Sequence, residues 1–213
     1  MPKPLQGVNG SGMHIHQSLF QNQENAFYSQ TDQYNLSATA YQFLAGQLKH
    51  ARALTAIVAP AVNSYKRLVP GYEAPINICW GRVNRSALIR IPQINANKTQ
   101  STRIELRCPD AMANPYLAFA AMLAAGLDGI KNNLQPPKPM EEDVYLLTEE
   151  QRIEKGIKVL LANLIEAINE LQTDEILKSL LGEHALKAFT EAAYKDINEA
   201  KFEVTPWEVK RYL

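Results

Sequence analysis

An alternating segment behind a glycine-rich loop constrains the fold of this chain most strongly. The loop, residues 10–12, reads Gly-Ser-Gly, and in residues 13–19 polar and apolar side chains alternate apart from one glutamine. Successive side chains of a β-strand point to opposite faces, so this pattern predicts a strand with one apolar face that can be buried. The other face carries His14, His16 and Ser18, behind a backbone that can approach a ligand closely because glycine has no side chain. A half-buried polar strand face is the simpler alternative, but two histidines at this spacing behind such a loop favour a binding site.

Length and cysteine content limit the class of protein. The chain has 213 residues, of which 46% are hydrophobic, enough for one ordinary globular core. Its two cysteines, Cys79 and Cys108, form neither a disulfide framework nor a zinc-binding spacing. No run of about 18 apolar residues is present, so we expect no membrane span. These features predict a protein of the reducing cytoplasm.

Charge is distributed unevenly along the chain. Residues 1–109 contain eleven Lys and Arg against four Asp and Glu, whereas residues 110–213 contain eleven against eighteen. The first half therefore has an excess of seven positive charges, which suits an anionic ligand. The alternative is that the two oppositely charged halves neutralise each other across a contact.

Caps, breakers and apolar periodicity predict a mixture of strands and helices. Ser37 is an expected N-cap, Asn114 followed by proline is another, and Gly182 is expected to end a helix. Two capping boxes are expected near the C-terminus, Thr148 with Gln151 and Thr205 with Glu208. The expected strands are residues 12–19, 76–80, 87–91 and 103–107, and the expected helices are 37–60, 115–132 and 183–202.

Arginines cluster in the middle of the sequence. Six of the nine lie between Arg67 and Arg107, and arginine forks bind phosphates and carboxylates bidentately. In the expected strand 103–107, Glu105 shares a face with Arg103 and Arg107. A glutamate between two arginines is either a structural ion-pair ladder or a ligand for a hard metal beside two anion-binding groups. The sequence has no phosphate-binding glycine loop, so any nucleotide would have to lie on strands and arginines.

Four long motifs resemble those of one enzyme family. They are residues 3–18, 63–75, 84–92 and 103–110, and in this order they are similar to segments of glutamine synthetases. The similarity continues from Asn114-Pro-Tyr to Thr205-Pro-Trp-Glu-Val, so it covers nearly the whole chain. The match is to the bacterial type I enzymes.

The resemblance implies an α+β fold, with an antiparallel sheet that is part of the family's catalytic barrel, backed by helices, and a helical C-terminal region. Residues 1–135 would be the C-terminal half of the catalytic domain, and residues 136–213 an acidic helical region of the same domain. The family's N-terminal domain, and a preceding half-domain with further metal-binding glutamates, would be missing. We therefore expect this chain to be inactive alone. The full-length family forms homo-oligomers of two stacked hexameric rings.

The resemblance also implies roles for individual residues in ATP-dependent joining of glutamate and ammonia. The inferred metal is Mg²⁺ or Mn²⁺, and ATP is the co-substrate. The inferred catalytic residues are Glu73 and Arg85, and the metal would be bound by His14 and Glu105. The residues that would bind glutamate are Asn9, Gly10, Arg67 and Arg107. The residues that would bind ATP are His16, Ser18, Arg90 and Arg103.

Other functions remain open on the sequence alone. A related ligase that joins glutamate to a polyamine would share the nucleotide-binding face, but such enzymes usually lack the glutamate that Glu73 represents. A non-catalytic relative acting as a binding or scaffold protein is a further alternative. Nucleic-acid binding by the basic half is disfavoured because aromatic residues are not interleaved with the basic ones. Tyr145 lies where some family members are adenylylated, but its flanking sequence differs and we expect no modification.

Overall fold

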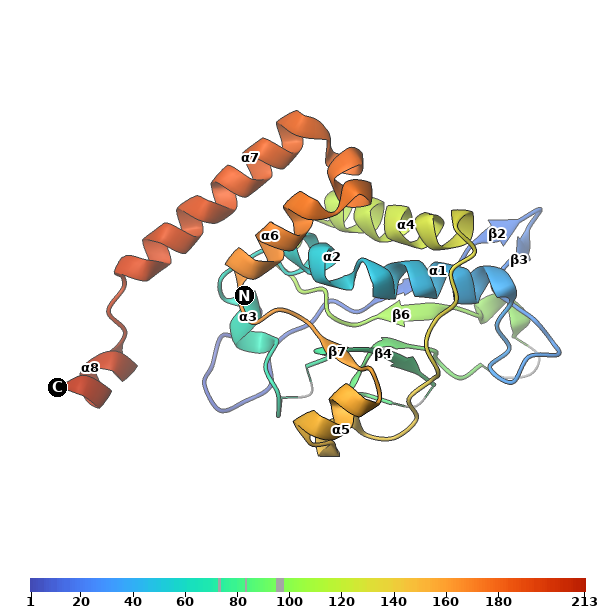
Figure 1. Cartoon of the computed structure of the whole chain (residues 1–213), viewed down its shortest axis with the longest axis horizontal. Helices are drawn as coiled ribbons and strands as arrows, with labels where there is room; N and C mark the ends of the chain where they lie inside the picture. Colours follow the sequence, from blue (N-terminus) through green and yellow to red (C-terminus); the bar gives the residue numbers. More distant parts are fainter. Residues whose placement is uncertain (73, 83, 95–97) are drawn as a thin grey trace.

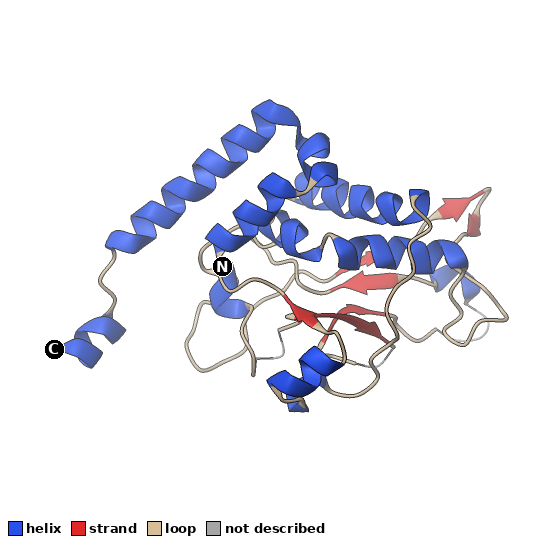
Figure 2. Cartoon of the chain, viewed as in Figure 1, coloured by secondary structure: helices blue, strands red, loops and turns tan. Residues whose placement is uncertain are grey.

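The structure is a computed structural model that describes residues 1–72, 74–82, 84–94 and 98–213. One sheet lies against a layer of helices, and the C-terminal helices extend away from this body (Figure 1). Figure 2 shows the same view by secondary structure. The strands are β1 (Ile15–Gln17), β2 (Phe20–Gln21), β3 (Glu24–Asn25), β4 (Asn77–Gly81), β5 (Ala87–Arg90), β6 (Ile104–Leu106) and β7 (Lys158–Val159). The α-helices are α1 (Ala38–Lys49), α2 (Ala51–Val58), α3 (Ser64–Arg67), α4 (Pro115–Lys131), α5 (Glu149–Glu154), α6 (Leu164–Thr173), α7 (Glu175–Phe202) and α8 (Pro206–Tyr212).

The main sheet has the strand order β1-β6-β5-β4-β7. The expected α+β class is confirmed, and the pairs β1–β6 and β5–β6 are antiparallel as predicted. The β4–β7 pair is also antiparallel, but β7 lies in the region that was expected to be helical, so this strand was not predicted. The β4–β5 pair differs, because it is parallel. Two strands joined by so short a connection would ordinarily form an antiparallel hairpin. Here Asn84 anchors the connection by donating to the carbonyls of Met140 and Glu142, so a segment distant in sequence redirects the chain.

Helix starts follow the sequence signals closely. The Ser37 side chain accepts a hydrogen bond from the Ala40 amide, and the Asn114 side chain accepts from the amides of Tyr116 and Leu117. Both expected capping boxes are present, at the starts of α5 and α8. The helix expected over 37–60 is instead two helices, because the backbone at His50 departs from helical geometry. Gly182 also departs, with a φ of 70°, which confirms the expected break inside α7.

The core lies between the sheet and the helices α1, α2 and α4. Helices α1 and α4 approach each other closely because glycines face each other at Gly46 and Gly129. A Cβ at Gly129 would lie 2.0 Å from the carbonyl oxygen of Gln42. The largest fully buried side chains include Trp80 and Phe43, from the sheet and α1.

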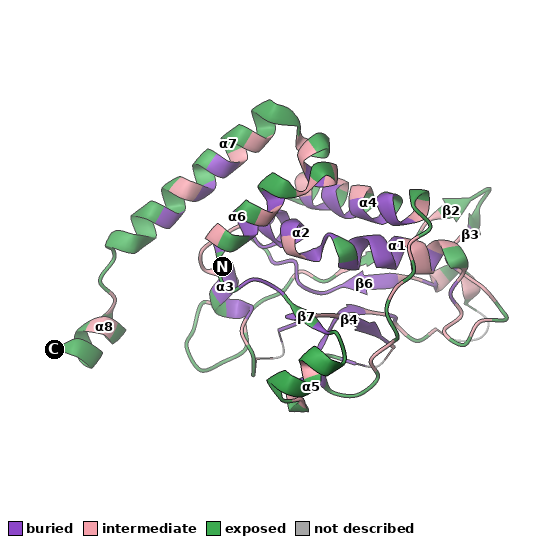
Figure 3. Cartoon of the chain, viewed as in Figure 1, coloured by how far each residue is buried: buried purple, intermediate pink, exposed green. Residues whose placement is uncertain are grey.

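The C-terminal region is only partly joined to this core. Helix α6 packs against α2, and β7 completes the sheet, so residues beyond 136 contribute to the same core. The partition at residue 136 stays a prediction. Beyond Gly182, α7 and then α8 are mostly exposed (Figure 3). Of the helices in the described part of the chain, none combines the length and the hydropathy that crossing a membrane would require.

Candidate active site

The histidine face of β1 is arranged as the alternation predicted. His14, His16 and Ser18 are exposed, whereas Ile15 is half-buried against the core. Gln17, on the same side as Ile15, exchanges hydrogen bonds with Gln47 of α1. The helices therefore cover one face of the sheet, and the two imidazoles lie on the other.

Glu105 lies at the centre of this face. It is only 2% exposed, and in the sheet register it is paired with His16 of β1 on one side and Arg90 of β5 on the other. His14 Nδ1 is 3.0 Å from Glu105 Oε1, and Arg90 Nε is 2.6 Å from Oε2. Burial would raise the pKa of this carboxyl, but the His14 hydrogen bond and the Arg90 charge outweigh it and hold the pKa below its ordinary value. Glu105 is therefore an ionised carboxylate in contact with the cation Arg90.

His16 and Arg103 form a second contact on this face. Arg103 Nε donates to His16 Nδ1 at 3.1 Å, and its Nη1 donates to the Ser101 carbonyl at 2.8 Å. Because a guanidinium only donates, Nδ1 of His16 is an acceptor and carries no proton. Burial lowers the pKa of His16, and the charges of Arg103 and Arg90 lower it further despite Glu105, so the imidazole is neutral.

Arg107 is buried at the end of β6. Its Nη1 donates to the carbonyls of Arg85 and Ala87, which fixes the start of β5 against β6. Its Nε has no hydrogen-bond partner among the described residues. The side chain of Arg85 is exposed. The Arg107 guanidinium is thus fixed in position by its Nη1 hydrogen bonds, and its buried Nε is still available to an anion.

Arg67 joins the glycine-rich loop to the sheet. From α3 its Nη1 donates to the Cys108 carbonyl at 2.7 Å and its Nη2 to the Arg107 carbonyl at 3.1 Å. Gly12 lies directly against it, since a Cβ there would be 2.5 Å from Nη2, and Gly10 packs on its aliphatic stem. The glycines therefore make room for a buried arginine that braces the site. A direct role of Arg67 and Gly10 in binding substrate stays a prediction.

The remaining expected site residues include Asn9, Ser18 and Glu73. Asn9 and Ser18 are exposed, in the loop and just after β1 respectively. Glu73 lies outside the described residues. The Tyr145 hydroxyl donates to the Ala74 carbonyl, close in sequence to that position.

The metal-ligating side chains on this sheet face fit part of a divalent metal site. Among the described residues no group of three or more His, Cys, Asp and Glu side chains could hold a metal ion. Glu105 and His14 supply a carboxylate and an imidazole in direct contact, and Glu105 Oε2 has no well-aligned hydrogen bond although Arg90 is close. Mg²⁺ and Mn²⁺ prefer oxygen-rich coordination. The chain therefore offers two ligands of a hard-metal site that needs further oxygens.

One buried cluster escaped the sequence analysis. His50, at the junction of α1 and α2, contacts Asp174 Oδ2 through Nδ1 at 2.6 Å and Asp128 Oδ2 through Nε2 at 2.9 Å. Lys49 also pairs with Asp128, at 2.8 Å. Asp128 and Asp174 are 78 and 124 positions from His50 in the sequence, so no local spacing could have indicated the cluster. The cluster ties α4 and α7 to the α1–α2 junction and lies among structural helices.

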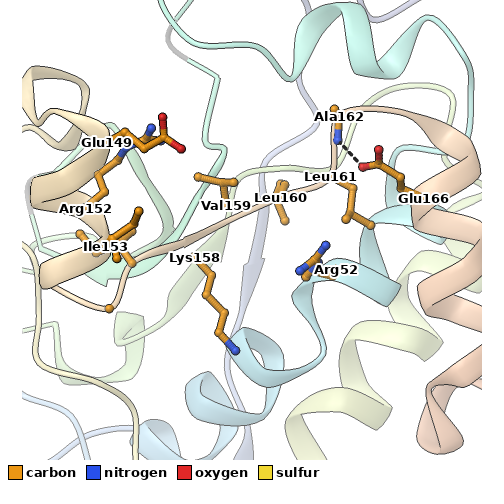
Figure 4. A pocket seen from close by; sticks show the side chains of 12 residues that line it. Arg52, Glu149, Arg152, Ile153, Lys158, Val159, Leu160, Leu161, Ala162 and Glu166 are labelled. Carbon is orange, nitrogen blue, oxygen red and sulfur yellow. Dashed lines mark hydrogen bonds between the residues drawn. The ribbon is translucent and has the colours of Figure 1, made fainter.

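A cavity of about 540 Å³ lies elsewhere, where α5, β7 and the start of α6 meet (Figure 4). Its charged lining has both signs, with Arg152 and Lys158 against Glu149 and Glu166. Glu166 accepts from the Ala162 amide at 3.1 Å. None of the expected site residues lines it. The sheet face centred on Glu105, and not this cavity, is the candidate active site.

Comparison with known proteins identifies the family of this chain. The family model described as "Glutamine synthetase, catalytic domain" matches residues 1–212. The glutamine synthetase of Thermotoga maritima is 54% identical over 213 residues, and that of Methanocaldococcus jannaschii is 50% identical over 214. Both matches cover all of this chain but 48% and 46% of the relatives, so the chain spans about half their length.

Solved structures give the same result. The Plasmodium falciparum glutamine synthetase matches with a TM-score of 0.88 at 29% identity, over 100% of this chain and 49% of its own. A complex of GmaS with ADP matches with a TM-score of 0.87 at 38% identity, over 100% of this chain and 48% of its own.

Proposed function

The chain belongs to the glutamine synthetase catalytic-domain family, and on that basis we propose that it supplies the C-terminal half of the active site of an ATP-dependent glutamate–ammonia ligase. The observation that supports this most is the row His16–Glu105–Arg90 across β1, β6 and β5, with His14 and Arg103 beside it. One buried carboxylate beside the Arg90 guanidinium and two histidines suits a metal-bound polyphosphate.

The proposed reaction has two steps. The γ-carboxylate of glutamate attacks the terminal phosphorus of ATP, which forms γ-glutamyl phosphate and releases ADP. Ammonia then attacks the acyl carbon, phosphate leaves, and the proton lost from nitrogen leaves with a base. Both reactants of the first step are anions, so cations must neutralise their repulsion. A divalent ion would provide electrostatic stabilisation of the phosphate groups.

The residues of this chain have proposed roles in those steps. His14 and Glu105 would hold the metal, and Glu105 is suited because it is ionised. Arg107 would bind the glutamate carboxylate with its remaining donor, braced by Arg67 and accompanied by Asn9 and Gly10. Arg85 would face the transferred phosphate, and Glu73 would take the ammonium proton and help to exclude water. The residues proposed to bind ATP are His16, Ser18, Arg90 and Arg103.

Nucleotide binding has independent support from a relative. GmaS, 38% identical to this chain, has been solved in complex with ADP. The two cysteines here are buried and free, which suits a reducing compartment, and we place the protein in the cytoplasm. We also propose that the complete enzyme is a homo-oligomer, as the family is.

The second candidate function differs only in the amine. A ligase that joins glutamate to a larger amine would use the same nucleotide and metal groups. Glu73 favours ammonia, because a carboxylate at that position can attract ammonium and accept its proton.

The test uses a completed enzyme, in which the N-terminal part of the Thermotoga maritima glutamine synthetase that lies outside the match precedes this chain in one polypeptide. With glutamate, ATP, Mg²⁺ and ammonium we expect glutamine, ADP and phosphate in equal amounts. Replacing ammonium by methylamine or putrescine should abolish turnover. Faster product formation with either amine would favour the second candidate, and no ATP consumption with any amine would contradict both.

A further inference from the structure

Arg85 lies between two buried polar residues. Asn84 and Ser86, which flank it, are 5% and 1% exposed, whereas the Arg85 side chain is exposed. Polar groups that are buried this deeply need hydrogen-bond partners within the protein. Both residues find such partners in residues 140–144, which are 56 to 58 positions further along the chain. We refer to residues 140–144 as the anchor segment.

The Asn84 side chain is at the centre of these contacts. Its Nδ2 donates to the carbonyls of Met140 at 2.9 Å and Glu142 at 2.7 Å. Its Oδ1 accepts hydrogen bonds from the Ser86 amide at 2.8 Å and from the Ser86 hydroxyl. The Ser86 hydroxyl in turn accepts from the Val144 amide at 2.9 Å. Asn84 therefore fixes the turn through Arg85 internally and also ties it to the anchor segment.

The backbone of Arg85 is held from the opposite side as well. Its carbonyl accepts from Arg107 Nη1, which also contacts the Ala87 carbonyl at 3.4 Å. Residues 84–87 are thus bonded both to β6 and to the anchor segment. An exposed cation is carried on a backbone that is restrained before, at and after its own position.

We propose that Asn84 is a positioning residue for the reaction and acts through Arg85. This inference rests on the proposed function, in which Arg85 faces the transferred phosphate. A cation stabilises developing charge most when it is already held in place before the reaction. Because Asn84 fixes the turn that carries Arg85, it sets the point from which the guanidinium reaches the phosphate.

A purely structural role of Asn84 is the alternative. Asn84 also directs the connection between β4 and β5, so its loss could simply lower the stability of the sheet. In that case the effect on turnover would have no particular relation to Arg85. A double-mutant comparison separates the two roles, because residues that act as one unit give non-additive effects.

The kinetic test uses the completed enzyme, with rates expressed per folded molecule. We expect Asn84→Ala to lower kcat at least about tenfold and to change the KM values for glutamate and ATP by less than about threefold, because a small displacement of a catalytic group slows the reaction step. The double variant Asn84→Ala with Arg85→Ala should be no slower than Arg85→Ala alone.

Asn25 provides a matched control. It is 8% exposed, its Nδ2 donates to the carbonyls of Gln100 at 3.0 Å and Thr102 at 2.8 Å, and its Oδ1 accepts from the Phe27 amide at 2.9 Å. Asn25→Ala therefore removes the same kinds of hydrogen bond at a different place. Combined with Arg85→Ala, it should multiply the effects of the two single variants.

A second measurement needs no turnover and uses the 213-residue chain. Amide hydrogen exchange in residues 84–88 should be faster in Asn84→Ala than in wild type, because the turn loses its contacts to the anchor segment. Asn25→Ala should leave that region unchanged and speed exchange in residues 100–102. Ser86→Ala removes only a hydroxyl and replaces Asn84→Ala in both measurements if that variant does not fold.

Three results would overturn the proposal. They are unchanged exchange in residues 84–88, a raised KM with kcat unchanged, and a double variant slower than Arg85→Ala by the full factor that Asn84→Ala shows alone. A completed enzyme that makes no glutamine would contradict the proposed function instead. The exchange measurement would then still decide whether Asn84 fixes the backbone of Arg85.

Discussion

At the residue scale, Arg107 is a buried cation whose Nε has no hydrogen-bond partner among the described residues. In the completed enzyme we expect Arg107→Ala to raise the KM for glutamate about tenfold to a hundredfold, because a charge-assisted hydrogen bond contributes about 1.5–3 kcal/mol. Steady-state kinetics with glutamate and ATP varied separately would measure this. Arg82→Ala is the control, since the Arg82 guanidinium lies over the Tyr34 ring, whereas its hydrogen bond to Glu141 comes from the backbone amide and is kept in alanine. An unchanged KM for glutamate with a raised KM for ATP would show that Arg107 binds the nucleotide.

Glu73 distinguishes ammonia from larger amines. In the completed enzyme Glu73→Ala should retain ATP binding, lose glutamine synthesis and release phosphate, because the unprotected intermediate hydrolyses. Product analysis at low ammonium would measure this. Glu142→Ala removes an exposed carboxylate that pairs with Lys155 and should leave synthesis intact. Full synthesis by Glu73→Ala would instead favour the ligase that joins glutamate to a larger amine.

The sequence predicted which side chains share a strand face, but it did not predict which side chains of different strands are in contact. The alternation at His14 and His16 and at Arg103, Glu105 and Arg107 predicted the shared faces correctly. The contact between His14 and Glu105 joins positions 91 apart, and strand register depends on packing that no local pattern contains. Only the resemblance to a family brought these residues into one proposed site.

At the element scale, the His50 cluster makes helix packing depend on pH. Burial would lower the pKa of His50, but its hydrogen bonds to Asp174 and Asp128 outweigh this effect and raise the pKa above 6.5, while both aspartates have lowered pKa values. The His50 contribution to stability is therefore full below pH 6.5 and is lost as pH rises through the raised value. The aspartate contribution is present above about pH 4 and is lost as pH falls.

Replacement of His50 tests that coupling. We expect His50→Gln to destabilise the chain by about 3 kcal/mol near pH 6, because it leaves the buried carboxylate of Asp128 and the partly buried carboxylate of Asp174 without the central cation. Urea unfolding at pH 5 to 9 should show the difference from wild type shrinking at the alkaline end. His184→Gln, at an exposed position on α7, is the matched control. A constant difference across this range would mean that His50 is neutral in the folded state.

Close packing of α1 and α4 gives a second test at this scale. Gly129→Ala should destabilise the chain by at least about 1–3 kcal/mol, because the added Cβ would meet the Gln42 backbone rather than a movable side chain. Gly71→Ala meets no atom within 4 Å but is strained by its φ of 88°, so it separates backbone strain from steric clash. Equal urea midpoints for Gly129→Ala and wild type would show that the two helices can move apart.

Helix starts were the more predictable part of the fold. Caps at Ser37, Asn114, Thr148 and Thr205 are local side-chain to backbone contacts, so residue identity nearly determines them. The break at His50 was not predicted, because the partners that hold it come from α4 and α7. The parallel direction of β5 was missed for the same reason, since the residues that fix the connection lie near 140.

At the scale of the whole molecule, we infer that this chain carries one half of an active site. Its described metal donors are too few for a complete site, and we expect the 213 residues alone to make no glutamine. Sensitive product detection with ATP, Mg²⁺, glutamate and ammonium should show none above background. Synthesis by the chain alone would mean that the site is complete without further residues.

The most direct measurement compares Glu105→Gln with Glu142→Gln in the completed enzyme. Glu105→Gln keeps the shape of the side chain but removes the negative charge at the centre of the His16–Glu105–Arg90 row, whereas Glu142→Gln makes the same change on an exposed side chain. The prediction is that Glu105→Gln lowers ammonium-dependent glutamine synthesis at least about a hundredfold with a raised Mg²⁺ requirement, and that Glu142→Gln retains the wild-type rate. Wild-type synthesis by Glu105→Gln at the same Mg²⁺ concentration would contradict it.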